Sequence, residues 1–542
     1  MVIKFAKSEK MKKMKFKIIC LIGGLIFLFA ANSCKDNFLV EEPTTFVSST
    51  NLYKTSADAQ MVLTGLYDAL QAGRFFQQEG IPFFWGDMGV DIEDIPPWTY
   101  NATGLYRHSA TWSYIEQIWR NIYLTVYRSN VALNRVGQMD KALFSDIRFN
   151  DEIKNEKDVI LGEAYFIRGM MYFYAVMIYG NVPLILEETT TLNTFPSQAT
   201  PQTMYEQVIS DLKMAESLLP WRRLAGEGGH ATKGAAKSML AKAYLQMTGF
   251  PLFQTANFSL AASKFKEVID SNVYGLLDTY PDIFNPNNED NKEIIFSVQY
   301  MAVEEGSSTG SYQGISGAVS KGAGYENTYV NKDFATSYDS SDVRFWWNIS
   351  RRAITGKLTQ NGFWYPWKFH SSPESDNSLK GFNWPVLRYS DVLLMYAEAL
   401  NGANPSPTPE AYWAINQVRR RARLDQADAD VSTSWLKALI EERLTNHQTT
   451  DNDLPDLSNL SKEDFLTALL KEQAWELCWE AQRKAMLIRT GKLKEYITEP
   501  HYKMQNYSYY PGLYFDESRD LWWPIPQREL DINPNLKQNP NY

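Results

Sequence analysis

A nearly all-apolar stretch from Glu163 to Leu186 constrains the fold of this chain more than any other feature. Apolar residues recur along it at three- and four-residue spacing, and the opposite side carries more aromatic and methionine side chains. A helix that is apolar on almost every side is buried inside a protein. The stretch is too short and aromatic to span a bilayer well, and it contains Arg168. Gly180 and Pro183 then end the helix, so the sequence predicts a central helix wrapped by others.

Helical periodicity returns in several other segments, namely 55–73, 112–136, 201–219, 231–248, 258–271, 391–402, 410–424 and 465–490. The pairs 231–248 with 258–271 and 391–402 with 410–424 resemble tetratricopeptide hairpins, because small residues stand where the two helices would cross. The last segment is predicted as one long amphipathic helix. Along it Glu472, Glu476, Glu480 and Arg483 are spaced as ion pairs within one helix are.

Two regions lack a clear period, residues 75–110 and 273–386, although 293–299 reads as a strand. Loops longer than about 12–15 residues are usually functional or disordered. Both regions are rich in aromatic residues, which argues against disorder. We therefore predict a mainly α protein with a single large domain, irregular helical hairpins embedded in it, and long loop insertions with minor β structure.

The start of the chain has the pattern of a secretory signal peptide. Seven Lys precede an apolar run from Ile18 to Ala31, which is too short for a membrane span. Small residues then lead to Cys34, as at a lipoprotein cleavage site, so residues 1–33 are predicted as signal peptide and 34–50 as lipid anchor and tether. The alternative is an ordinary signal peptide followed by an unrelated cysteine. A multiply acylated cysteine would anchor the chain stably, since each buried CH₂ contributes roughly 0.8 kcal/mol.

Charge and motifs exclude several classes of function. The formal net charge is −9, and removing residues 1–33, with seven Lys and one Glu, lowers it to −15. Nucleic-acid binding rests on basic patches, so no nucleic-acid partner is expected. The chain has no phosphate-binding loop, HExxH or GxSxG motif, and its five His are scattered, so we expect neither catalysis, nor a cofactor, nor a metal site. Asp91, Glu93 and Asp94 could hold calcium, or they form a solvated acidic loop.

The first irregular region offers the best candidates for ligand binding. Trp98, Tyr100 and Asn101 follow two prolines in a loop. A sugar ring has apolar C–H faces and a rim of hydroxyls, so its binding needs exposed aromatic rings beside amides, carboxylates or Arg. Each ring could instead pack its loop onto the body of the protein, and both interpretations stay open.

Several motifs resemble those of the SusD/RagB family of outer-membrane nutrient-binding lipoproteins. They are Arg168 in a helix closing on YGNVPLI (179–185), Phe38-Leu39 with Pro43, Trp119 with Tyr123 and Asn130, Tyr205 with Asp211-Leu212, the run from Glu476 to Lys492, and the ending PIP…NPN…QNP (524–540). The family usually carries an acid where Met486 stands. Together these motifs span nearly the whole mature chain.

The resemblance implies a domain over residues 51–542, with a helical-hairpin body at about 51–272 and 387–542 and a ligand face on the two irregular regions. It implies a non-catalytic surface lipoprotein, lipid-anchored at Cys34 in the outer membrane and facing the cell exterior. Its ligand would be an oligosaccharide and its partner a SusC-like TonB-dependent transporter. The ligand residues expected on that face are Trp85, Asp91, Trp98, Tyr100, Asn101, Tyr325, Tyr329 and Trp364.

Three alternatives remain at this point. The same scaffold could bind peptides, as implied by the RagB branch of the family. The hairpins could instead form an interaction scaffold for a protein partner. A secreted glycosidase needs only two carboxylates, which the chain has in plenty.

Overall fold

The computed structural model describes residues 14–15, 52–71, 75–76, 80–94, 101–191, 194–224, 226–285, 287–300, 329–339, 341–351, 363–369, 383–423, 454–498 and 510–542. The chain divides into two units, residues 1–54 and 55–542. All of the elements named below belong to the second unit.

Helices dominate this unit, and most were predicted. The longer ones are α2 (Ser56–Gln71), α4 (Ser113–Gln138), α5 (Glu156–Tyr179), α6 (Pro201–Leu218), α7 (Lys233–Gln246), α8 (Asn257–Asp270), α12 (Tyr389–Ala403), α13 (Pro409–Arg421) and α15 (Lys462–Leu477). The shorter ones are α3 (Asn101–Gly104), α10 (Lys332–Ser337), α11 (Val343–Asn348), α16 (Arg483–Arg489), α17 (Leu493–Ile497) and α18 (Gln527–Ile532), with single turns η2 (Ile81–Asp87), η3 (Lys141–Leu143), η4 (Pro281–Phe284) and η6 (Pro511–Leu513).

The strands of the described residues are short and form two-stranded antiparallel sheets. The pairs are β1 (Glu93–Asp94) with β7 (Tyr329–Val330), β2 (Asp146–Phe149) with β3 (Glu152–Asn155), β4 (Val182–Pro183) with β5 (Gln198–Ala199), β6 (Ile294–Val298) with β10 (Trp384–Arg388), and β8 (Ile349–Ser350) with β9 (Tyr365–Pro366). The mainly α class with minor β structure is therefore confirmed, and β6 confirms the strand expected at 293–299.

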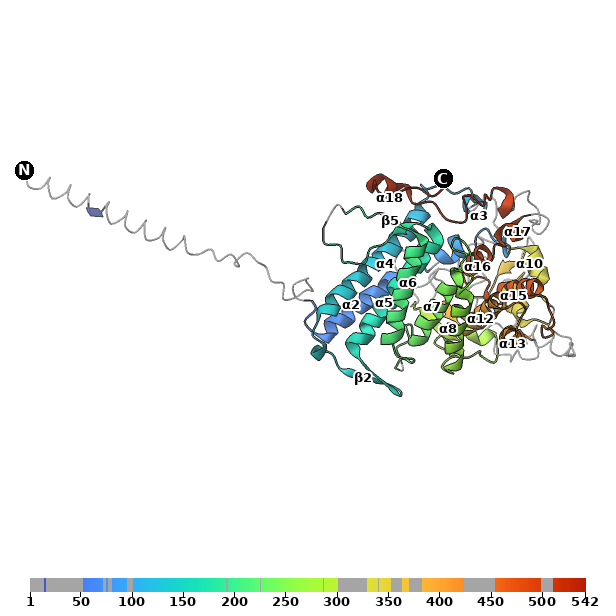
Figure 1. Cartoon of the computed structure of the whole chain (residues 1–542), viewed down its shortest axis with the longest axis horizontal. Helices are drawn as coiled ribbons and strands as arrows, with labels where there is room; N and C mark the ends of the chain where they lie inside the picture. Colours follow the sequence, from blue (N-terminus) through green and yellow to red (C-terminus); the bar gives the residue numbers. More distant parts are fainter. Residues whose placement is uncertain are drawn as a thin grey trace, which may run out of the picture. The chain divides into compact units, whose positions relative to one another are not determined.

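The helices pack as a row of neighbours. Helix α5 lies between α4 and α6, and contacts continue from α6 to α7, α8, α12 and α13, as can be followed in Figure 1. The pairs α7–α8 and α12–α13 are the two hairpins expected from the sequence, and α12 joins them by packing on α8. Because each helix is covered on both sides, the row forms one continuous core.

Helix α5 is the buried central helix that the sequence predicts. Asn155 caps its start by accepting a hydrogen bond from the backbone N–H of Lys157, and nearly every side chain from Val159 to Tyr179 is buried. Gly180 ends it with φ of +73°, a conformation that side chains disfavour. Trp522 also packs where a Cβ on Gly180 would lie, at 2.6 Å.

Arg168 explains why three of the resembling motifs occur together. Its guanidinium donates to both oxygens of Asp211 on α6, at 2.8 and 2.6 Å, and to Oδ1 of Asn130 on α4, at 2.9 Å. The amide of Asn130 in turn donates to the carbonyl of Ile185 in the segment after α5. One buried arginine thus joins three helices and the exit strand, and a buried charge needs such partners.

The expectation of one helix over residues 465–490 is wrong. The chain leaves α15 at Leu477, makes a turn over Cys478–Gln482, and re-enters a helix at Arg483. Trp479 and Ala481 in this turn have φ of +65° and +61°. No glycine or proline marks the break, so its cause is tertiary contact rather than local propensity.

The C-terminal segment packs on the end of α5. The backbone N–H of Trp523 donates to the carbonyl of Ile178, and the amide of Asn539 donates to the carbonyl of Tyr179, at 2.8 and 2.9 Å. The proline- and asparagine-rich ending is therefore a structural brace for the central helix.

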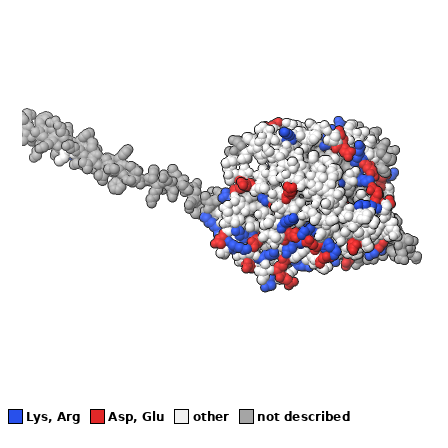
Figure 2. All heavy atoms as spheres, in the orientation of Figure 1, with Lys and Arg blue, Asp and Glu red and all other residues white. Residues whose placement is uncertain are grey.

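On the face shown in Figure 2, acidic and basic side chains are mixed and gather toward the lower and right edges. Neither sign forms a continuous field on that face. Among the described residues, no helix has both the length and the apolar character needed to cross a bilayer.

Candidate functional site

The two irregular regions, predicted to share a ligand face, are joined by a small sheet. In it Glu93 of β1 pairs with Val330 of β7, and Asp94 pairs with Tyr329. Asn331 extends the contact, because its backbone N–H donates to the carbonyl of Ile92 and its amide donates to Asp94 Oδ1, each at 3.1 Å. We call this meeting point of the two regions the junction.

The first region reaches the junction through a tightly packed turn. In η2 every residue from Ile81 to Asp87 is buried. Gly86 lies so close to Ala481 that a Cβ there would be 2.4 Å from the Cα of Ala481. Asp87 Oδ2 accepts a hydrogen bond from the backbone N–H of Ala481, at 3.2 Å, and burial raises the pKa of Asp87 to about 7.

The turn Cys478–Gln482 also holds the second region. Lys368, beyond β9, donates to the carbonyls of Glu476 and Cys478 at 2.8 Å and to Glu480 at 2.5 Å. The indole N–H of Trp479 donates to the carbonyl of Asn348, at the end of α11. One irregular turn therefore touches both insertions, which explains why the helix is interrupted there.

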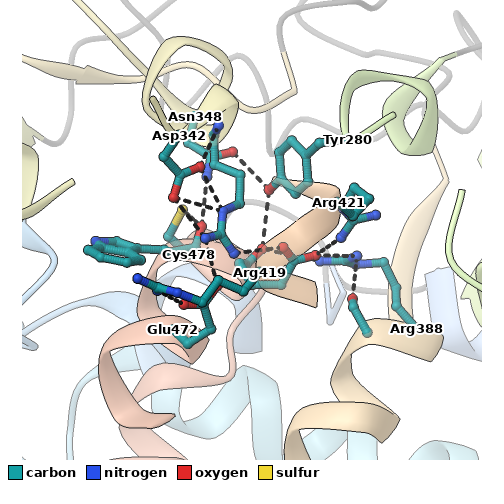
Figure 3. Close-up of polar contacts among 12 residues, drawn as sticks. Tyr280, Asp342, Asn348, Arg388, Arg419, Arg421, Glu472 and Cys478 are labelled. Atoms are coloured by element: carbon teal, nitrogen blue, oxygen red, sulfur yellow. Dashed lines mark hydrogen bonds and ion pairs between the residues drawn. The ribbon is translucent and has the colours of Figure 1, made fainter. Parts of the chain in front are cut away.

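A buried cluster of charges surrounds this turn, and Figure 3 shows part of it, with Arg419 beside Glu472 and Tyr280 beside Asn348. Five carboxylates face five cations within it: Glu293, Asp342, Glu472, Glu476 and Glu480 face Arg344, Lys368, Arg388, Arg419 and Arg421. We call this set the ionic cluster. The charges balance, as burial requires.

The ionic cluster corrects the expected role of the acidic spacing on α15. Glu472, Glu476 and Glu480 do not pair along one helix but with residues from β10, α11 and α13. Burial disfavours the charged form of Glu476, but Arg421, Arg388 and Arg344 outweigh that effect and lower its pKa. Cys478 is a free, buried cysteine, and burial raises the pKa of its thiol to about 12.

An aromatic surface lies beside the junction. Phe345, Trp346, Phe363 and Trp364 are all half-buried, and we call them the aromatic shelf. The ring of Phe345 is 4.5 Å from that of Trp346 and 5.4 Å from that of Trp364, between centroids. The carbonyl of Trp364 accepts from the N–H of Val330, so the shelf is tied directly to β7. The guanidinium of Arg351 lies 5.5 Å from the ring centroid of Trp364.

A cavity of about 340 Å³ opens at the junction, where Asp91 and Asn331 line it. Its lining combines rings with donors and acceptors: Asp91, Asn331, Asp333, Phe334, Ser337, Thr467, Lys471, Ala474, Trp475, Arg483, Glu495 and Tyr496. The ring of Tyr338 links cavity and shelf, since it stacks on Trp475 at 5.4 Å and contacts Phe345 at 5.9 Å. Cations hold two of the rings, Lys471 over Trp475 at 4.7 Å and Arg483 over Tyr496 at 5.1 Å.

The predicted site residues fall into three groups. Trp98, Tyr100, Tyr325 and the predicted lipidation residue Cys34 lie outside the described residues, and Asn101 begins α3 without a described side chain. Trp364 is on the shelf and Asp91 lines the cavity, where both of its oxygens accept from Arg483, at 2.8 and 2.6 Å. Trp85 and Tyr329 are 1% and 5% exposed, so neither presents an open ring face in this structure, and their assignment as ligand residues stays a prediction.

The acidic group of β1 is not a solvated loop. Glu93 and Asp94 are 0% and 4% exposed, because β1 is covered where it pairs with β7. Within the ranges given above, no three His, Cys, Asp or Glu residues are arranged to hold a metal ion.

Sequence reasoning missed the C-terminal contribution to the site. Lys471, Trp475 and Tyr496 line the cavity, yet the first two stand in a segment that reads as ordinary amphipathic helix, and Tyr496 lies beyond the last predicted helix. The only hint was the excess of tryptophan near residues 475–479, which core packing explains equally well.

Comparison with known proteins agrees with this architecture. A family model described as the SusD family matches residues 345–542, and one described as starch-binding and associating with the outer membrane matches residues 38–245. The SusD-like protein P25 of Formosa agariphila is 26% identical over 586 residues, covering 96% of this chain and 98% of that protein.

Solved structures show the same fold. A SusD homolog from Bacteroides thetaiotaomicron matches with a TM-score of 0.74 at 23% identity, over 92% of this chain and 99% of that one. A laminarin-binding SusD-like protein matches with a TM-score of 0.67 at 22% identity, over 90% of this chain and 100% of that one. The fold is thus that of the SusD-like proteins. Taken with the two family models, this means that the chain belongs to the SusD/RagB family.

Proposed function

We propose that this protein is a surface lipoprotein that binds an oligosaccharide at the junction and passes it, uncleaved, to a SusC-like TonB-dependent transporter. The observation that carries the proposal is the presence, where the two insertions meet, of the aromatic shelf and of a cavity whose lining combines rings with carboxylates, an amide and cations. Half-buried rings offer apolar faces to the C–H groups of a sugar. Carboxylates, amides and cations in the cavity can pair its hydroxyls.

The comparisons support the class of ligand. One matching family model is described as starch-binding, and one solved neighbour is described as laminarin-binding. Neither matching family is described as an enzyme. Binding without cleavage therefore fits this chain better than the glycosidase alternative.

The ligand can be tested by calorimetry with maltohexaose, laminarihexaose and a set of tri- to hexapeptides. We expect one of the hexasaccharides to bind. Trp364→Ala should lower the affinity roughly tenfold, which corresponds to about 1.4 kcal/mol of binding free energy. Trp413→Ala is the matched control, because Trp413 is an exposed ring on α13 outside the junction, and it should bind normally. Binding of peptides alone would favour the peptide-binding alternative, and release of reducing ends would show catalysis.

Anchoring and delivery are tested in cells. The family model described as associating with the outer membrane supports an anchored protein, and Cys34 follows the small residues of the predicted cleavage site. We expect Cys34→Ser to move the protein from the outer-membrane fraction to the soluble fraction. Deletion of the gene should reduce glycan uptake, and a SusC-like transporter should co-purify with the full-length protein. Retention of the Cys34→Ser variant in the membrane would contradict the anchor.

A further inference from the structure

A second and larger cavity lies among the turn of the β2–β3 hairpin, the loop between α6 and α7, and strand β6. Its volume is about 510 Å³, inside the range of about 300–1,000 Å³ typical of small-molecule sites. It shares no lining residue with the junction cavity. We call it the α6–α7 pocket.

Two aromatic rings in its wall are held in place by their own contacts. Trp221, half-buried in the loop after α6, has the ammonium groups of Lys233 and Lys237 at 5.6 and 5.7 Å from its ring centroid. The hydroxyl of Tyr274 is hydrogen-bonded to that of Thr232 at 2.7 Å. Rings fixed in this way lose little freedom when a ligand binds, which favours affinity.

His230 presents a fixed nitrogen to the pocket. Its Nδ1 lies 2.8 Å from Oε2 of the buried Glu163. Burial opposes ionisation of Glu163, but Arg223 and His230 outweigh it and lower the pKa of the carboxyl. An ionised Glu163 accepts a hydrogen bond from Nδ1–H, so in the neutral ring Nε2 is an acceptor. Among the described residues, no hydrogen bond is recorded for Nε2, and the His230 side chain is 36% exposed.

The charges around the pocket cancel. Arg222, Arg223 and Lys292 line it, and they are matched by Glu227 and Asp290 in the lining and by Glu163 behind it. The two lysines beside Trp221 are paired as well, Lys233 with Glu152 and Lys237 with Glu216 and Glu267. A charged ligand would gain no net attraction from such a lining. A neutral, hydroxyl-rich ligand, by contrast, would find donors, acceptors and two aromatic rings together.

We infer that the α6–α7 pocket is a second binding site for neutral oligosaccharides, distinct from the junction. The inference rests on the proposed glycan-binding function. Two sites on one chain hold two stretches of a polysaccharide at once, which raises the avidity for long chains over short ones.

The experiment is a calorimetric titration of the full chain with maltohexaose and laminarihexaose, followed by the same titration of single-site variants. We expect two sites per wild-type chain for the hexasaccharide that binds. Trp221→Ala should weaken binding at the α6–α7 pocket at least tenfold and leave binding at the junction unchanged. Arg222→Ala, at an exposed residue, should do the same. Trp364→Ala should weaken binding at the junction and leave binding at the α6–α7 pocket unchanged. The intact second site in each variant reports that the chain is folded, and Trp413→Ala should keep both.

The outcomes separate the two proposals. Suppose that the wild-type chain shows a single site, that Trp364→Ala removes it, and that neither Trp221→Ala nor Arg222→Ala changes it. This result would overturn the proposal of a second site and leave the proposed function standing. Absence of binding by either hexasaccharide would overturn both. Loss of the site under Arg222→Ala in a chain that still binds at the junction supports the pocket even if Trp221→Ala does not fold.

Discussion

Two regions of the molecule, one around α5 and one around α15 and α16, are held together by opposite means. Around α5 the interior is apolar and aromatic, and its charged contacts centre on single residues such as Arg168 with Asp211. Around α15 and α16 the interior is the ionic cluster, with ten charged groups in mutual contact. Apolar packing tolerates change in small steps, whereas a buried charge set fails when one member is lost. The proposed ligand face is built on the second kind of interior.

The largest effect should come from removing the carboxylate that joins three arginines. Glu476→Ala leaves Arg344, Arg388 and Arg421 short of a partner in a buried setting. We expect a loss of about 3–5 kcal/mol in the free energy of unfolding, measured by urea titration. A loss under about 1 kcal/mol would mean that the ionic cluster is not the stabilising interior of this region.

The next effect depends on pH and concerns Asp87. Its folded pKa of about 7 lies above the ordinary value of 3.8, so ionising it opposes folding, and stability is lost as the pH rises from about 4 to 7. Asp87→Asn keeps an acceptor for the N–H of Ala481 but cannot ionise. The free energy of unfolding of the variant should equal that of wild type at pH 4 and exceed it increasingly up to pH 7. The difference should reach at most about 4 kcal/mol, at about 1.4 kcal/mol per pKa unit. Parallel pH profiles in urea titrations would refute this.

A conservative change in the apolar interior should cost much less. Ile167 on α5 is fully buried among apolar side chains. Ile167→Val removes one methylene, so we expect a loss of about 0.5–1.5 kcal/mol by urea titration. The equally conservative Glu476→Gln should cost clearly more, since it removes a charge from the balanced cluster. Equal losses for the two variants would erase the contrast between the two interiors.

The smallest effect should come from an exposed ion pair. Lys141 pairs with Asp158 at 2.7 Å, but its side chain is largely in solvent. Lys141→Ala should leave the urea midpoint unchanged within error, because water and salt screen such pairs. A shift as large as that of Ile167→Val would show that surface pairs matter in this protein.

The sequence predicted the apolar interior well because its signal is local. Residues 112–136 and 201–219 show helical spacing, and α4 and α6 end within two residues of those bounds. The neighbours of α5 could also be inferred, since a helix buried on every side must be covered.

The ionic cluster could not be predicted in the same way. Glu476 meets Arg344 and Arg421, which are 132 and 55 residues away in the chain. Spacing along one helix suggested local pairs, and the break after Leu477 carries no glycine or proline. The lining of the junction cavity could not be predicted either, because Trp475 and Tyr496 come near Asp91 only in the folded chain. The burial of Trp85 and Tyr329 could not be predicted either, because the sequence of a loop does not show whether an aromatic side chain faces solvent or the core.

The close approach of Gly86 to Ala481 has a consequence for engineering and for divergence within the family. There is no space for even one extra carbon between these backbones. A segment around Gly86 that is grafted from a relative will pack correctly only if the segment between α15 and α16 is exchanged with it, so these two segments form one transplantable unit.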